Sequence, residues 1–155
     1  MEVIKPPHSI DITAGNKVVF LAGSIDMGNA VDWQAKVTLA LNNVPITFLN
    51  PRRDDWDASW EQSIDNPQFA TQVNWELDGL EKADCIAMYF APHSKSPITL
   101  LELGLFAQSN KLLVCCPDTF WRKGNVDVVC KRYGIRQLPD LESLIEAIKQ
   151  ACAKD

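Results

Sequence analysis

Short apolar runs recur along the chain and alternate with longer amphipathic segments. Their length and composition suit strands that are buried in a parallel sheet. We expect strands at residues 17–22, 45–50, 85–90, 111–116 and 135–137. We expect helices at about residues 30–42, 67–82, 97–107, 126–132 and 141–151. This alternation predicts an α/β fold with an open parallel five-stranded sheet and helices on both faces.

The length and composition indicate one domain. The chain has 155 residues, of which 46% are hydrophobic, and this is enough for one substantial core. We therefore treat residues 1–155 as a single domain. Residues 1–16 carry Pro6, Pro7 and Gly15, and we expect them to form an irregular N-terminal arm.

Glu102 is the unusual residue of the helix expected at residues 97–107. That helix begins with Ser96 followed by Pro97, an N-cap and first-turn pattern, and only Thr99 and Glu102 interrupt its apolar sequence. Burying an unpaired carboxylate is costly, so Glu102 needs either a partner or a chemical function. A solvated or salt-bridged glutamate is the alternative interpretation.

A second carboxylate is expected to face inward from the helix at residues 67–82. Its apolar stripe is predicted at Phe69, Val73, Leu77 and Leu80. Glu76 falls beside this stripe and not opposite it. The alternative for Glu76 is an ion pair with a lysine on the helix surface.

Two loops should meet at the carboxyl edge of the sheet. The first, residues 23–28, follows the strand at 17–22 and is bounded by glycines, although a plain structural turn would look the same. The second follows the strand at 85–90. Both lie at a topological switch point, where α/β sheets bind ligands. The residues gathered there are Ser24, Ile25, Ser94, Ser96 and Glu102.

The loop at residues 51–66 is long for a connection between a strand and a helix. It carries Arg52 and Arg53 together with Trp56 and Trp60. The tryptophans could form a flap over a flat aromatic ligand, or they could anchor the loop to the body of the protein.

Charge and composition exclude several classes of partner. The net charge is −5, and the basic residues are scattered, so we expect no nucleic-acid polymer as a partner. Residues 1–8 lack the layout of a signal peptide and no apolar run is long enough for a membrane span, so we expect no membrane and a cytoplasmic location. Five cysteines without a clustered spacing suggest reduced core residues, and two histidines offer little for a metal site.

Three motifs in order resemble the nucleoside 2-deoxyribosyltransferase superfamily, which includes nucleoside 5'-monophosphate N-glycosidases. They are Phe-Leu-Ala-Gly-Ser-Ile at residues 20–25, Glu-Leu-Asp-Gly-Leu-Glu-Lys-Ala-Asp at residues 76–84, and Ser96 six residues before Glu-Leu-Gly at 102–104. The resemblance spans roughly residues 17–116. It implies a flavodoxin-like (Rossmann-like) fold, no metal or organic cofactor, and a symmetric homodimer or higher homo-oligomer.

The resemblance also implies roles for single residues. Glu102 corresponds to the nucleophile that attacks the anomeric carbon, and Glu76 to the acid that assists the leaving base, at a position usually held by aspartate. Ser24 and Ser96 correspond to contacts with a 5'-phosphate, and Ser96 reaches across a dimer interface.

The sequence departs from the superfamily pattern at several positions. Asp26 stands about where nucleotide-cleaving members carry a phosphate-binding arginine, so Arg52 or Arg53 would have to supply the positive charge. The segment that contains Arg52 and Trp56 points to a subfamily with its own specificity. The transferases carry an aspartate shortly before the nucleophile, and residues 94–101 contain none.

We therefore expect an enzyme that cleaves or transfers the N-glycosidic bond of a (deoxy)nucleoside or nucleoside 5'-monophosphate through a covalent glycosyl-glutamate intermediate. Hydrolysis is slightly favoured over base exchange because the transferase aspartate is absent. One alternative is a nucleoside 2-deoxyribosyltransferase, and another is a catalytically silent nucleotide-binding or sensing module. A purely structural interaction protein would leave Glu102 unexplained.

Overall fold

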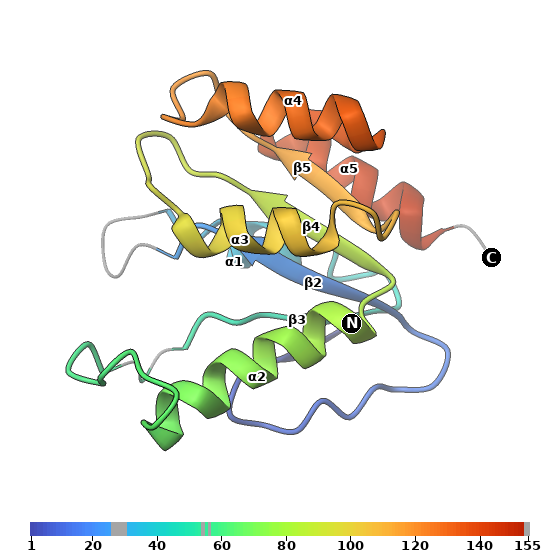
Figure 1. Ribbon diagram of the computed structural model, residues 1–155. Helices are drawn as coiled ribbons and strands as arrows, with labels where there is room; N and C mark the ends of the chain where they lie inside the picture. Colours follow the sequence, from blue (N-terminus) through green and yellow to red (C-terminus); the bar gives the residue numbers. More distant parts are fainter. Residues whose placement is uncertain (26–30, 54, 56, 154–155) are drawn as a thin grey trace.

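The computed structural model describes residues 1–25, 31–53, 55 and 57–153, and its described residues form one parallel sheet between two layers of helices (Figure 1). The strands lie in the order β1-β3-β2-β4-β5-β6, and every neighbouring pair is parallel. Their bounds are β1 Glu2–Ile4, β2 Lys17–Gly23, β3 Ile46–Leu49, β4 Cys85–Tyr89, β5 Leu112–Cys115 and β6 Arg136–Leu138.

The helices follow the strands as the sequence pattern predicts. Their bounds are α1 Trp33–Ala40, α2 Pro67–Lys82, α3 Pro97–Phe106, α4 Lys123–Tyr133 and α5 Leu141–Cys152. The prediction of an open parallel α/β sheet with helices on both faces is confirmed, and the architecture is flavodoxin-like. In the described part of the chain, none of these helices has the length and apolar character needed to cross a membrane.

The N-terminal arm contains a strand that the sequence pattern did not predict. Residues 2–4 form β1, which pairs with β3 at the edge of the sheet, so the sheet has six strands where five were expected. Ile4 is buried, and its carbonyl accepts a hydrogen bond of 2.9 Å from the Asn50 amide. Three residues are too few to show a periodicity, so only pairing with β3 reveals the strand.

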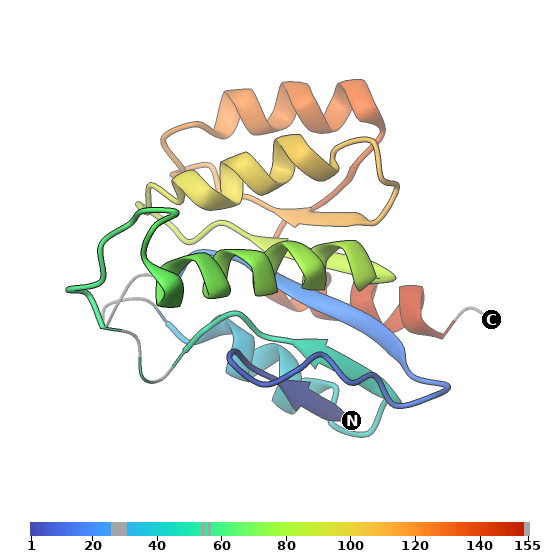
Figure 2. The same cartoon turned by 60° about the horizontal axis from the view of Figure 1, so that its bottom comes forward.

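Side chains alternate between two cores along each strand. On one face, Phe20, Ile86 and Val114 pack with α2, α3 and α4. On the other, Leu21, Ala87 and Leu113 pack with α1 and α5. Figures 1 and 2 show these two helical layers on opposite sides of the sheet. The connections from β2 and β4 leave towards opposite edges, so the switch point lies between these two strands.

The inward side of α2 differs from the predicted stripe. Its buried residues are Gln72, Trp75, Gly79 and Leu80, whereas Leu77 is 36% exposed. Gly79 sits so close to Phe20 that a Cβ there would lie 2.8 Å from its ring. Trp75 donates its indole N–H to the His8 carbonyl at 2.8 Å. These contacts fix the helix so that Gln72 faces the protein interior.

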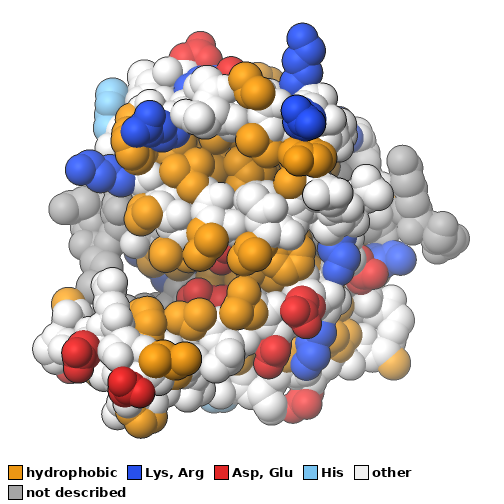
Figure 3. Space-filling view, viewed as in Figure 1, with side chains coloured by type: hydrophobic (Ala, Val, Ile, Leu, Met, Phe, Trp, Pro, Cys, Tyr) orange, Lys and Arg blue, Asp and Glu red, His pale blue; other side chains and the backbone are white. Residues whose placement is uncertain are grey.

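The α3 helix buries polar residues and exposes apolar ones. Thr99, Glu102 and Leu103 are its buried residues. Ile98, Leu101 and Leu105 are 57%, 58% and 58% exposed. Figure 3 shows apolar side chains spread over α3 and the surface beside it. Glu102 is therefore buried although the same helix leaves three large apolar side chains exposed to solvent.

Candidate active site

Three serine hydroxyls meet where β2 and β4 end. The Ser24 and Ser94 hydroxyl oxygens are 3.0 Å apart, those of Ser94 and Ser96 are 2.9 Å apart, and Ser24 also contacts Ser96. Ser24 and Ser94 are buried, and Ser96 is partly accessible. The sequence prediction that these two loops lie together at the carboxyl edge of the sheet is thus correct.

The serine cluster is not closed on itself. Ser24 Oγ accepts the Ala91 N–H at 2.9 Å, and the Ser94 hydroxyl donates to the Ala91 carbonyl at 2.8 Å. Two hydroxyl hydrogens then remain for three serine–serine contacts, so one of these contacts lacks a hydrogen. The hydroxyls of Ser24 and Ser96 are therefore able to turn towards a ligand.

Ser96 occupies the N-cap position of α3, but its hydroxyl does not cap the helix. Its backbone lies in the left-handed region, with φ of 43°, which is unusual for a residue other than glycine. The hydroxyl contacts the other two serines instead. The first amides of α3 consequently receive no capping from Ser96, and a helix N-terminus with free N–H groups next to hydroxyls suits an anion.

Glu102 is buried without a compensating charge. It is 8% exposed, and within the described residues it makes no hydrogen bond or ion pair. Burial, and secondly the negative charge of Glu76, raise its pKa from the ordinary 4.5 to about 8. The alternative of a solvated or salt-bridged glutamate does not describe this residue.

Glu76 lies close enough to Glu102 to affect its ionisation, and it too is largely buried. The Gln72 side-chain amide donates to Glu76 Oε1 at 2.7 Å. Burial raises the pKa of Glu76 above its ordinary value, and the Gln72 hydrogen bond opposes that rise. In the part of the chain that the structure describes, no lysine pairs with Glu76.

Two neighbouring carboxyls in a largely buried setting do not ionise independently. Because each ionised group opposes ionisation of the other, the pair loses its two protons in separate steps, and one proton is retained between those steps. Gln72 supports the ionised form of Glu76, whereas no donor among the described residues supports that of Glu102. The Gln72 hydrogen bond therefore favours ionisation of Glu76 before that of Glu102. Figure 3 shows acidic atoms recessed between the surfaces over α2 and α3.

The other binding residues predicted from the sequence are not shown in contact with the serine cluster, and two of them lie outside the described residues. Ile25 follows Ser24 and is 36% exposed. Arg52 follows β3 in the chain, and its Nη1 is 3.8 Å from Oδ1 of Asp32, the N-cap of α1. Among the described residues, no hydrogen bond or ion pair joins Arg52 to the serines. Asp26 and Trp56 fall outside the described residues, so their predicted roles stay predictions.

The long loop after β3 is held by its own side chains. Arg53 makes two hydrogen bonds to Asp55, at 2.9 and 2.8 Å, and its guanidinium lies 5.0 Å from the centre of the Trp60 ring. Arg53 is thus engaged within the loop and is a poor candidate for a phosphate ligand. For Trp60 the anchoring interpretation fits better than the flap.

Two aromatic residues that the sequence did not single out support Ser24 from behind. The Trp33 indole N–H donates to the Ser24 carbonyl at 3.2 Å, and the Tyr89 carbonyl accepts the Ser24 N–H at 3.0 Å. The two rings pack with centroids 5.3 Å apart. Both residues look like core aromatics in the sequence, and only the structure reveals their contact with the site.

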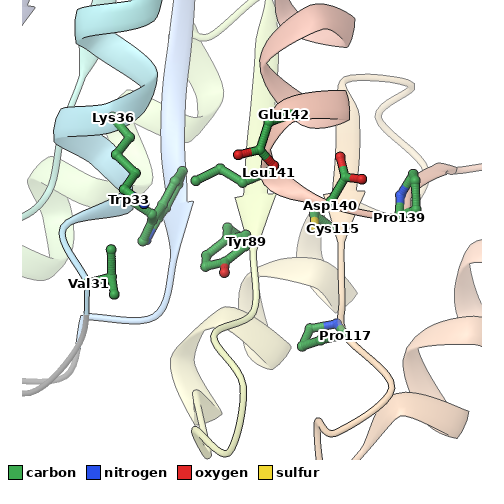
Figure 4. Close-up of a pocket in the computed structure, with 10 residues that line it drawn as sticks. All are labelled: Val31, Trp33, Lys36, Tyr89, Cys115, Pro117, Pro139, Asp140, Leu141 and Glu142. Atoms are coloured by element: carbon green, nitrogen blue, oxygen red, sulfur yellow. The ribbon is translucent and has the colours of Figure 1, made fainter.

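These two rings also line a cavity of about 340 Å³ between α1 and α5 (Figure 4). Its charged lining consists of Lys36, Asp140 and Glu142. The cavity opens on the face of the sheet opposite α2 and α3, so it does not contain the carboxyl pair. Any reaction at Glu76 and Glu102 would therefore take place outside this cavity, on the α2 and α3 face of the sheet.

Among residues 1–25, 31–53, 55 and 57–153, no group of three or more His, Cys, Asp or Glu side chains is placed to hold a metal ion.

Replacing Glu102 with glutamine should make stability less dependent on pH. Folding raises the pKa of Glu102 from 4.5 to about 8. The contribution of Glu102 to the unfolding free energy is therefore most favourable below pH 4.5 and is lost as the pH rises through 8. Glu102→Gln cannot ionise, so at pH 8.5 it should exceed wild type in unfolding free energy by up to about 5 kcal/mol. The difference should shrink towards pH 5. Urea unfolding across this range measures it, and parallel curves for both proteins would contradict a buried, uncompensated Glu102.

Comparisons with known proteins agree with this fold. A crystal structure of a conserved protein from Enterococcus faecalis V583 is similar, with a TM-score of 0.62 and 12% identity, and the match covers 87% of this chain and 98% of that chain. At this identity the likeness concerns the fold alone. The sequence has no significant match among curated proteins. The family model described as nucleoside 2-deoxyribosyltransferase like matches residues 16–120, which include the serine cluster and both carboxyls, and the chain therefore belongs to the nucleoside 2-deoxyribosyltransferase-like family.

Proposed function

We propose that the protein cleaves the N-glycosidic bond of a (deoxy)nucleoside or nucleoside 5'-monophosphate through a covalent intermediate on Glu102, with water as the preferred acceptor. The observation that supports this proposal is the pair of neighbouring carboxyls on α2 and α3, buried Glu102 and partly buried Glu76, which no cation among the described residues neutralises. Membership of the family supports a nucleoside-processing enzyme in general.

The pair with one proton has what the reaction needs. The Glu102 carboxylate forms a bond to the anomeric carbon while the carbon–nitrogen bond breaks and its electrons move to the base. Glu76 supplies a proton to the departing base. Water then attacks the glycosyl ester, Glu76 takes a proton from that water, and Glu102 leaves with retention of configuration.

The proton must move before the first step, because in the free protein the Gln72 hydrogen bond favours its retention on Glu102. Sugar hydroxyls that donate to Glu102 would lower its pKa and favour transfer of the proton to Glu76. Substrate binding would thus convert the resting pair into a nucleophile and an acid. This arrangement protects the protein from ionising Glu102 in an empty pocket.

The serine cluster is our candidate for the 5'-phosphate site. Ser96 and Glu102 are six residues apart on one helix, or about 9 Å along its axis, a spacing suited to a nucleotide that lies along α3. The phosphate would receive hydrogen bonds from the serines and from the first amides of α3. Arg52 would have to leave Asp32 to contribute its charge.

A catalytically silent nucleotide-binding module is the alternative from another class. It would keep the serine cluster but would not need a buried pair of acids, which carries a cost in stability. Retention of both Glu76 and Glu102 therefore favours the enzyme. Base exchange is the second alternative, since a glycosyl-enzyme can react with a free base as well as with water.

We also propose that a second copy of the chain covers the exposed face of α3. Ile98, Leu101 and Leu105 form an apolar stripe there, and monomeric proteins seldom leave such contiguous stripes in water. The same helix begins at Ser96, so a partner on this face would lie beside the serine cluster. A homodimer would then complete the rim of the site.

The function is tested by incubating the protein with nucleosides and nucleoside 5'-monophosphates and measuring release of free base. We expect Glu102→Gln to lower kcat at least about a thousandfold, because its amide cannot attack the anomeric carbon. Glu81→Gln, an exposed position on α2, is the matched control and should retain full activity. Release of no base from any substrate would favour the binding module, and more than about a tenth of normal activity in Glu102→Gln would refute the nucleophile.

A second free base in the same assay distinguishes hydrolysis from transfer. We expect free sugar or sugar phosphate as the main product with or without the added base. A new nucleoside that carries the added base would establish the transferase instead.

Leu101→Glu should disrupt the proposed dimer, because it places a charge in the centre of the apolar stripe. Sedimentation at micromolar concentration should show a dimer for wild type and a monomer for this variant. Leu39→Glu, at a 73% exposed leucine of α1, is the control and should remain dimeric. A wild-type monomer, or a dimer that tolerates Leu101→Glu, would argue against this interface.

A further inference from the structure

Gln72 is a buried glutamine whose amide nitrogen serves two acceptors. Its Nε2 donates to Glu76 Oε1 at 2.7 Å and to the Pro51 carbonyl at 3.2 Å. The residue is 4% exposed, and its Oε1 is buried without a hydrogen-bond partner in the described part of the chain. One glutamine thus connects the acid on α2 to the segment that follows β3.

The contacts determine which way the amide faces. Both neighbours are oxygens that accept hydrogen bonds, so the nitrogen must point at them and the oxygen away. A flipped amide would bring its oxygen against two other oxygens. The orientation therefore holds even though it leaves a buried carbonyl oxygen unpaired, which is unfavourable. Such a local violation is most easily understood at a functional site.

The anchor for Gln72 is itself fixed. Next to Pro51, the Asn50 side chain accepts the Arg52 N–H at 3.0 Å, and the Asn50 N–H donates to the Ile4 carbonyl at 2.9 Å. Gln72 is therefore held by a segment tied to the edge of the sheet. A glutamate side chain has three rotatable bonds, and contact with a fixed donor restricts them.

Gln72 also makes the two acids unequal. Two groups act on the Glu76 carboxyl, which are Glu102 on α3 and Gln72 on α2, the helix of Glu76 itself. No cation among the described residues acts on either carboxyl. Glu102 has no donor equivalent to Gln72 among the described residues. Glu102 is also the more buried of the two, so the Gln72 hydrogen bond adds to the difference that burial makes between the acids.

We propose that Gln72 is a positioning residue that orients Glu76 through Oε1, leaves Oε2 as the oxygen that takes up and releases the proton, and keeps the resting proton of the pair on Glu102. The catalytic meaning of this inference rests on the proposed function. The hydrogen bond and its effect on ionisation of the two acids are independent of that function, and both can be measured in the free protein.

The test is a carbon-13 NMR titration of the Glu76 and Glu102 carboxyls in substrate-free protein. In wild type we expect Glu76 to ionise at lower pH than Glu102. Gln72→Met keeps the length of the side chain and removes the donor, so Glu76 should ionise at higher pH and the gap between the two midpoints should narrow. An unchanged order and gap would overturn the proposal.

Gln34→Met is a matched control. Gln34 is a fully buried glutamine of α1 whose side-chain nitrogen and oxygen both lack hydrogen-bond partners among the described residues, and the site does not use it. This variant should leave both carboxyl titrations unchanged. An equal narrowing in Gln34→Met would show a general effect of buried substitution and would also overturn the proposal.

A measurement on wild type keeps the inference testable if Gln72→Met does not fold. The side-chain amide resonances of Gln72 should shift with pH at the same midpoint as the Glu76 carboxyl, because the two groups are hydrogen-bonded. Resonances that do not respond to that ionisation would refute the contact.

Kinetics separate this inference from the proposed function. If the protein releases base, Gln72→Met should lower kcat roughly tenfold or more, move the pH–rate profile and change KM little. If Gln72→Met narrows the difference between the Glu76 and Glu102 midpoints, but neither wild type nor the variant releases base, the positioning role is upheld and the proposed function is refuted. Normal kcat and an unshifted pH–rate profile in Gln72→Met would refute the positioning role and leave the function intact.

Discussion

The burial of two neighbouring carboxyls without a cation is the constraint on which the site depends. Glu76 and Glu102 come from adjacent helices on one face of the sheet, and both have raised pKa values because of burial. Such a pair is unfavourable for folding when both groups ionise, and it is stable with one retained proton. One carboxylate and one acid are also what cleavage of an N-glycosidic bond requires. The same pair of carboxyls thus lowers the stability of the fold and supplies the groups for the proposed reaction.

The fold brings the remaining parts to this pair. The switch point between β2 and β4 places Ser24 beside Ser94 and Ser96, and α3 runs from these serines to Glu102. From the opposite face of the sheet, Trp33 holds the Ser24 carbonyl. On α2, Gln72 holds Glu76. One rigid sheet therefore sets the distance between the candidate phosphate site and the candidate nucleophile.

Much of this arrangement can be predicted from the sequence, because long apolar runs and proline-marked helix starts are local signals. The strands, the helices, the serine loops and the unusual position of Glu102 follow from them. Contacts between distant segments give no such signal. The β1 strand exists only through pairing with β3, the rotation of α2 depends on Gly79 against Phe20, and the partners of Ser96 and Arg52 come from other elements. Gln72 looks like an ordinary helix residue until its partners are seen.

The covalent intermediate on Glu102 is the central claim, and mass spectrometry tests it most directly. The protein would be mixed with a 2-fluoro nucleoside, whose fluorine slows hydrolysis of a glycosyl ester by opposing its oxocarbenium-like transition state. It would then be quenched in acid and digested. We predict an added glycosyl mass on the peptide that contains Glu102. Release of base without any adduct, or an adduct on the peptide that contains Glu76, would contradict the assignment of the nucleophile.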